Sequence, residues 1–198
     1  MDTITSSIKG VLIDTWPMIA LSCVVLIVIR LTYLFKNKIT FNVANELMML
    51  TFVIYILCLF QIVTSGDVSG EHGVNVTLFK ELTRYQVGSR LFYRNIIGNI
   101  IMFIPFGFFT SYYLKLDKKR FIFYVSLIVS VAIELIQLKI GRAFDVDDII
   151  LNMVGSFAGY YLYRIMDRIF GDLSDTIKGS LIVIGILTTI VLLTFIVF

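Results

Sequence analysis

Hydrophobic residues run in long, nearly unbroken blocks along the chain, and short polar connections separate these blocks. About 20 apolar residues are needed for a helix to cross the hydrocarbon core of a bilayer. Because the apolar runs are continuous and not alternating, they predict helices and exclude a closed transmembrane barrel. The pattern predicts six membrane-spanning helices, at residues 17–35, 44–64, 94–114, 121–138, 148–165 and 179–198.

Composition agrees with this all-α prediction of a polytopic transmembrane helical bundle. Hydrophobic residues make up 58% of the chain, and the mean hydropathy is +0.91. An average soluble domain is roughly 45–50% apolar. We therefore expect residues 1–198 to form a single transmembrane domain.

The distribution of charge predicts an orientation. Basic residues concentrate in the short connections, at Lys36 and Lys38, at Lys115 and Lys118 to Arg120, and at Arg164, Arg168 and Lys178. Positively charged short loops usually remain in the cytoplasm. Both termini are then extracytoplasmic, as are the loops at 65–93 and 139–147. A membrane-facing loop explains the basic run at 118–120, and no stretch of the chain indicates a nucleic-acid partner.

The long loop at 65–93 has some structure of its own. Its first part, residues 65–73, is rich in glycine and serine and is expected to be flexible. Leu78, Leu82 and Tyr85 then repeat at helical spacing. This repeat predicts a short amphipathic helix over 78–87 on the outer interface, although an ordinary structured loop explains it equally well.

Polar side chains interrupt the outer ends of three predicted spans. With a rise of about 1.5 Å per residue along an α-helix, Asn99, Glu134 and Asn152 each lie about 6–8 Å inside the membrane interface. Short connections join these antiparallel spans, so the polar groups are expected to meet at one depth. The set consists of Asn95 and Asn99, Glu134 and Gln137, and Asp145, Asp148 and Asn152, with Arg142 between the last two groups.

Two interpretations of this polar set stay open. In the first, the side chains only connect helices through hydrogen bonds worth roughly 0.6–2 kcal/mol each. In the second, they line a binding pocket open to the outer surface, because ionisable groups inside a membrane usually mark function. Arg142 would partly balance Glu134, while Arg90 and Arg94 approach from the other side. Three guanidinium groups suit a phosphate or carboxylate head group.

Catalytic and metal-binding roles are narrower hypotheses. Glu134 is the candidate general acid or base, whereas no Ser–His or Cys–His arrangement indicates a nucleophile. Asp145, Asp147 and Asp148 offer oxygen ligands for Mg²⁺ or Ca²⁺. Capping of the following helix explains the same aspartates, so neither a metal nor another cofactor is expected.

The backbone near the polar set is also unusual. Pro105 removes a hydrogen bond in the middle of its predicted span, which kinks the helix. Gly155 and Gly159 form a G-x-x-x-G step, which allows a neighbouring helix to approach closely. Close packing one turn below the polar residues would give a shallow pocket a tight floor.

The ordered motif resembles the VanZ-like family. It begins with Asn95-x3-Asn99-x3-Phe103-x-Pro105-x-Gly107. It continues as Glu134-x2-Gln137-x4-Arg142-x2-Asp145-x2-Asp148-x3-Asn152-x2-Gly155-x3-Gly159. The resemblance covers residues 90–164, taken as the family core, and leaves 179–198 as an accessory span. It implies a multi-pass protein of the bacterial cell membrane, typically Gram-positive, in a family named for low-level teicoplanin resistance.

Three functions follow as hypotheses. In the first, the protein binds or remodels an envelope amphiphile at the outer leaflet and lowers susceptibility to lipoglycopeptides. Its partners would be membrane lipids and a lipid-linked cell-wall precursor or the lipoglycopeptide. In the second, it is an intramembrane enzyme that acts on a lipid-linked cell-wall intermediate through Glu134. In the third, it is a small proton-coupled transporter.

Overall fold

The computed structural model confirms the all-α fold class. It describes residues 2–39, 42–64, 73–79, 83–84, 86–170, 173–174, 177 and 179–180, with the backbone alone for 2–15, 19, 90 and 94. The chain forms two compact units. The first combines Met1–Ser65 with Asp172–Phe198, and the second is Gly66–Gly171.

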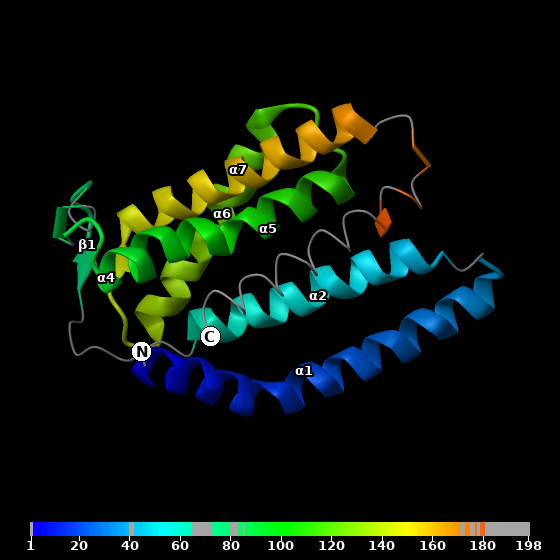
Figure 1. Ribbon diagram of the computed structural model, residues 1–198, viewed down its shortest axis with the longest axis horizontal. Helices are drawn as coiled ribbons and strands as arrows, with labels where there is room; N and C mark the ends of the chain where they lie inside the picture. The colour runs from blue at the N-terminus through cyan, green and yellow to red at the C-terminus, as the bar shows by residue number, and fades with distance from the viewer. Residues whose placement is uncertain are drawn as a thin grey trace. The chain divides into compact units, whose positions relative to one another are not determined.

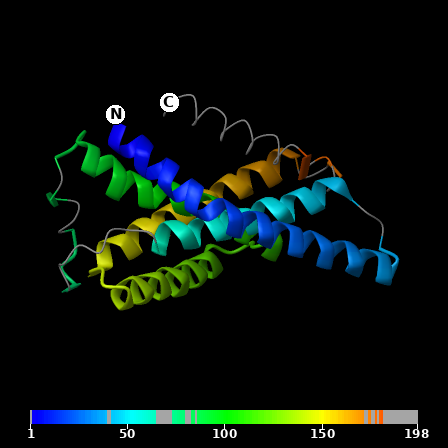
Figure 2. The same cartoon turned by 90° about the horizontal axis from the view of Figure 1, so that it is seen from below.

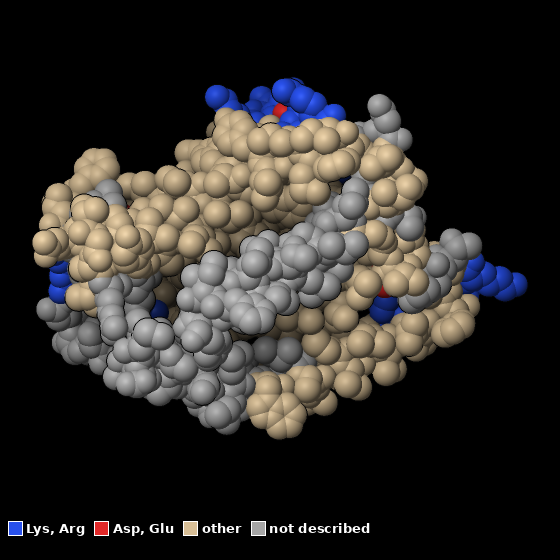
Figure 3. Space-filling model, viewed as in Figure 1, with Lys and Arg blue, Asp and Glu red and all other residues tan. Residues whose placement is uncertain are grey.

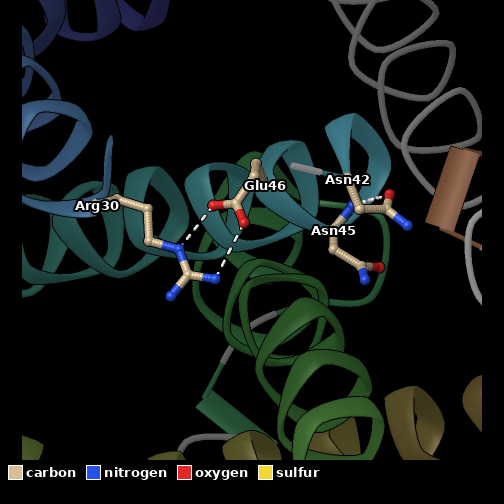
Figure 4. Close-up of polar contacts among 4 residues, drawn as sticks. All are labelled: Arg30, Asn42, Asn45 and Glu46. Atoms are coloured by element: carbon tan, nitrogen blue, oxygen red, sulfur yellow. Dashed lines mark hydrogen bonds and ion pairs between the residues drawn. The ribbon is translucent and has the colours of Figure 1, made fainter. Parts of the chain in front are cut away.

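In the first unit, two long helices form a hairpin. Helix α1 spans Asp2–Asn37 and helix α2 spans Val43–Thr64 (Figures 1 and 2). Helix α1 begins well before the expected start at residue 17, so Pro17 lies inside the helix. The Asn42 side chain caps α2, because its Oδ1 accepts hydrogen bonds from the backbone amides of Ala44 at 3.1 Å and Asn45 at 3.3 Å. Figure 4 shows the contact between Asn42 and Asn45.

A bidentate ion pair joins α1 to α2. Arg30 Nε lies 2.8 Å from Glu46 Oε2, and Arg30 Nη2 lies 3.0 Å from Glu46 Oε1 (Figure 4). The two side chains are 35% and 16% exposed. Both residues lie within apolar segments long enough to cross a membrane, where an isolated charge is costly. Each charge is therefore compensated by its partner on the neighbouring helix.

Removal of one partner should cost more than removal of both. We expect Arg30→Leu or Glu46→Leu alone to destabilise the protein by about 1–2 kcal/mol, because each leaves one charge without compensation. The double variant should recover part of that loss. Thermal unfolding of the purified variants in one detergent measures the effect. Additive losses in the double variant would show that the pair does not connect the helices energetically.

In the second unit, a π-helical turn precedes the first long helix. Helix α4 (Arg90–Phe92) leads into the π-helix η1 (Tyr93–Ile97), which continues as α5 (Gly98–Leu114). The other long helices are α6 (Lys119–Lys139) and α7 (Val146–Phe170). Two short strands, β1 (Val74–Asn75) and β2 (Phe144–Asp145), pair in parallel.

Helix α7 packs closely against α5 along most of its length (Figure 1). Three glycines allow this approach. A Cβ atom on Gly107 would meet the backbone of Ser156, and one on Gly155 or Gly159 would meet the carbonyl oxygen of Ile100 or Ile104. The G-x-x-x-G step predicted from the sequence therefore faces α5.

Helix α6 packs on another side of α7 (Figure 2). At the start of α6, Leu116 and Ile122 form a buried cluster with Tyr160, and Phe157 packs against it. At the other end, the chain turns back through Gly141, whose φ of 91° suits a residue without a Cβ atom. This turn brings β2 and the start of α7 back to the end of α6.

Four of the described helices are long and apolar enough to cross a membrane: Trp16–Asn37, Val43–Thr64, Asn95–Leu114 and Lys119–Lys139. They coincide with the first four predicted spans within a few residues. The fifth predicted span is helical as α7, but α7 is not among the four apolar helices. The sixth lies almost entirely outside the described residues, so the count of six stays a prediction.

The amphipathic helix expected over 78–87 is described only in part. Thr83 and Arg84 are helical, and Thr83 donates its backbone N–H to the Phe79 carbonyl oxygen at 3.2 Å. Residues 80–82 and 85 lie outside the described residues. The chain is no longer helical at Gln86 and turns at Gly88, where φ is 88°, so the helix does not extend to Val87 as expected.

Candidate functional site

The polar residues at the end of α6 are joined in a hydrogen-bonded relay. Glu134 is buried, with 1% of its surface exposed. In the amide orientation that satisfies both of its neighbours, Gln137 donates Nε2–H to Glu134 Oε1 at 3.0 Å. Its Oε1 accepts from Arg142 Nη1 at 2.9 Å. Arg142 is thus coupled to Glu134 through one intervening amide.

The other oxygen of Glu134 fixes the start of β2. Glu134 Oε2 accepts a hydrogen bond from the backbone N–H of Asp145 at 2.9 Å. This contact joins the last turns of α6 to the chain that enters α7. Both carboxylate oxygens of Glu134 are therefore engaged with protein donors, which compensates for the burial of this acidic group.

Asp145 joins this relay to the long loop. Its Oδ2 accepts from the Asn75 side-chain amide at 2.9 Å, while its Oδ1 accepts from the backbone N–H of Asp147 at 2.8 Å. Asn75 also lies opposite Asp145 in the parallel pairing of β1 with β2. Asp147 is 1% exposed and accepts the backbone N–H of Phe79 at 2.7 Å. Residues 74–79 are thus held against the connection between α6 and α7.

A second contact joins α5 to α7 at the same end. The Asn99 side-chain amide donates to Asp148 Oδ1 at 2.6 Å. Asn152 follows Asp148 by one helical turn and is 2% exposed. Its Oδ1 has no hydrogen-bond partner in the described part of the chain. Asn95 is half-buried in the π-helical turn.

The polar face continues along α6 into the apolar segment. Ser126 and Ser130 precede Glu134 at steps of four residues, and both side chains are fully buried. Because Ile122 packs with Tyr160, equal helical steps place Ser126 level with Ser156 and Ser130 level with Asn152. Like Asn152 Oδ1, the Ser130 Oγ atom lacks a partner among the described residues.

The structure therefore brings together most of the residues predicted for the site. Glu134, Gln137, Arg142 and Asp145 share one relay, and Asn99 bonds to Asp148, one helical turn before Asn152. The side chains of Arg90 and Arg94 lie outside the described set, so the proposed three-guanidinium cradle stays a prediction.

Three parts of the site were missed by sequence reasoning. Asn75 and the backbone of Phe79 lie in an irregular loop whose pattern does not indicate a long-range contact. Ser126 and Ser130 were detectable, because polar residues at steps of four before Glu134 mark one helical face. The π-helical turn has no recognised signal in the sequence.

The aspartates considered as metal ligands accept hydrogen bonds from protein N–H groups. Asp145 and Asp147 accept from backbone amides, and Asp145 also accepts from Asn75. In the described ranges, no group of three His, Cys, Asp or Glu side chains is placed to hold a metal ion. The geometry therefore fits loop attachment and helix capping.

Long apolar helices with a buried polar cluster at one end define a helical membrane protein. A sequence profile of the VanZ/LLP1 family matches residues 19–167, which is most of the chain. The chain therefore belongs to the VanZ/LLP1 family. The match includes α1 and α2 and so extends beyond the motif at 90–164.

A curated relative, Protein VanZ from Enterococcus faecium, is 34% identical to the chain over 109 residues. The aligned region covers 52% of this chain and 63% of that relative, so the chain spans somewhat less than two thirds of its length. No solved structure matches the chain significantly.

Proposed function

We propose that this protein binds or remodels an envelope amphiphile at the outer leaflet of the bacterial cell membrane and thereby lowers susceptibility to teicoplanin and related lipoglycopeptides. The family, named for low-level teicoplanin resistance, supports the link to these drugs. A glycopeptide that bears an acyl chain concentrates in the outer leaflet. The proposed orientation, with both termini extracytoplasmic, directs the polar cluster toward that leaflet.

The observation that carries the proposal is the relay from Asn75 through Asp145, Glu134 and Gln137 to Arg142. The relay connects Asn75, in the loop before α4, to the carboxylate of Glu134 inside the apolar helix α6. Arg142 is half-buried and held by Gln137, so its guanidinium is preorganised at the end of α6. A preorganised guanidinium suits the phosphate or carboxylate of an amphiphile head group.

The geometry of Glu134 favours binding over acid–base catalysis. Both of its oxygens accept hydrogen bonds, from the Asp145 backbone and from Gln137. A general acid or base must exchange a proton with its substrate, and Glu134, which is only 1% exposed, offers a substrate little access to its oxygens. We therefore assign Glu134 a positioning role within the binding site, with the intramembrane enzyme as the rival hypothesis.

Lipid mass spectrometry of whole cells distinguishes the two hypotheses. Cells without the protein, cells with it, and cells with Glu134→Gln are compared, with lipoglycopeptide susceptibility measured in parallel. We expect no change in the covalent structures of the envelope lipids and a several-fold higher inhibitory concentration with the intact protein. The increase should be lost in Glu134→Gln.

Two controls make the comparison decisive. The amount of each variant in the membrane fraction is measured, and Leu135→Ala, an exposed change on the same helix, should behave as the intact protein. An envelope lipid that appears or disappears only with an intact Glu134 would favour the enzyme. Equal susceptibility with and without the intact protein would overturn the proposal.

A further inference from the structure

A shallow, open cavity lies at the end of α6 opposite Glu134. Its volume is about 460 Å³, and its lining residues are Asp117, Lys118, Lys119, Arg120, Tyr160 and Tyr161. This volume is within the range of about 300–1,000 Å³ that is typical of ligand pockets. The cavity lies between α7 and the connection from α5 to α6. Figure 3 shows Lys and Arg side chains gathered at the top of the view, over this connection.

Packing fixes one wall of the cavity. Tyr160 is 5% exposed and belongs to the buried cluster with Leu116 and Ile122. Its hydroxyl donates to the Asp117 carbonyl oxygen at 3.1 Å, which ties the connection to α7. The neighbouring Tyr161 is 51% exposed and leaves its ring available to a ligand.

Basic residues outnumber acidic residues around the cavity. Its lining includes three cations, Lys118, Lys119 and Arg120, and one carboxylate, Asp117. Arg164 forms an ion pair with this carboxylate, with Nη1 at 3.2 Å from Oδ1. The acidic group is thus already compensated. Lys118 and Lys119 remain to attract an anion, and Arg120 adds to the local charge while its guanidinium lies over the Phe121 ring, 5.1 Å from the centroid.

The cavity lies at the expected depth of lipid head groups. Lys119 is the first residue of the apolar helix Lys119–Lys139, so the cavity adjoins the end of the hydrocarbon region. Tyrosines are enriched at this boundary. On α6 beside it, Phe121, Tyr124 and Ile128 are 46%, 59% and 68% exposed, which provides an apolar surface for acyl chains.

We propose that this cavity binds the phosphate of an anionic phospholipid head group, on the membrane side opposite the polar relay. Lysine and arginine supply the charge for the phosphate, and Tyr161 contacts the glycerol region. The site is independent of the proposed lipoglycopeptide function. Basic residues that only set the orientation of the protein in the membrane would explain the charges but not the cavity. A bound lipid explains the charges, the cavity and the exposed Tyr161.

Native mass spectrometry of the purified full-length protein tests the proposal. The probes are phosphatidylglycerol and phosphatidylcholine with the same acyl chains, added at equal concentrations. Basic residues near an anionic surface each contribute about 1 kcal/mol, or roughly fivefold in affinity. The variant Lys118→Gln, Lys119→Gln, Arg120→Gln should therefore retain phosphatidylglycerol at least about tenfold less strongly, with no change for phosphatidylcholine.

A matched control removes the same charge elsewhere. The variant Lys36→Gln, Lys38→Gln, Arg168→Gln changes three exposed basic residues that do not line the cavity, and it should bind phosphatidylglycerol as the intact protein does. Equal losses in both triple variants would overturn the proposal, because general surface charge would then explain retention. Equal retention of the two lipids by the intact protein would also overturn it.

A variant that keeps every charge guards against altered topology or folding in the triple variants. Tyr161→Ala should weaken retention of phosphatidylglycerol several-fold, whereas Tyr124→Ala, at an exposed site outside the cavity lining, should not. Soluble glycerol phosphate should fail to displace the lipid at equal concentration. Its displacement of the lipid, or unchanged retention in Tyr161→Ala, would contradict a lipid head-group site.

Discussion

Gly159→Leu should abolish the accumulation of folded protein in the membrane. A side chain at this position would meet the backbone carbonyl oxygen of Ile104, and its Cβ would lie 2.6 Å from the backbone nitrogen of Phe108. Backbone atoms of a packed helix cannot move aside as a flexible side chain does. We expect a cost above the ~1–3 kcal/mol of ordinary overpacking, against a typical total stability of ~5–15 kcal/mol.

Fluorescence-detected size-exclusion chromatography of detergent extracts measures this loss. Ala158→Leu is the matched control, because it adds the same side chain at the preceding, exposed position of α7. It should yield the amount of monodisperse protein that the intact chain yields. Normal yields from Gly159→Leu would show that α5 and α7 do not need this close approach.

The helices around the relay were predictable because their signals are local. The lengths of the hydrophobic runs identified the helices. The short connection between α6 and α7 required these two helices to be antiparallel neighbours. Glu134 and Gln137 share a face because they lie one turn apart, and the polar start of α7 returns to the same end. The reasoning about depth placed Asn99 level with Asn152, whereas the structure pairs Asn99 with Asp148, one helical turn earlier on α7.

The contacts of the loop were not predictable in this way. Asn75 meets Asp145 through a parallel pairing of two-residue strands, which is too short to leave a periodic pattern. The bond from the Phe79 backbone to Asp147 uses an N–H group that every residue except proline carries. Such contacts depend on tertiary placement and not on residue type.

The ion pair between Arg30 and Glu46 was missed although its signal was present. Both charges lie inside apolar segments near the same end of an antiparallel hairpin. Opposite charges at similar depth in adjacent membrane helices predict a pair.

The fifth predicted span, α7, is harder to recognise as a membrane span from its hydropathy. The polar residues of α7 suit contacts with α5 and α6, and they lower the hydropathy that identifies a span.

The central claim is that the polar residues at the end of α6 act as one site. Gln137 connects Glu134 to Arg142, because its side-chain amide bonds to both. Glu134→Gln replaces one of two acceptor oxygens with an NH2 group, so either Gln137 or the Asp145 backbone loses its acceptor. Arg142→Gln removes the charged end of the relay. Each change alone should reduce protection against a lipoglycopeptide severely, by about tenfold or more, because buried partners are left unsatisfied.

The most direct test is a double-mutant cycle on these two residues. Lipoglycopeptide susceptibility is measured for the intact protein, both single variants and the combined variant, and each value is normalised to the amount of protein in the membrane. Residues that act as a unit show non-additive effects. Our account predicts that the combined variant loses little more protection than the worse single variant. Strictly additive losses from the two changes would contradict a single site.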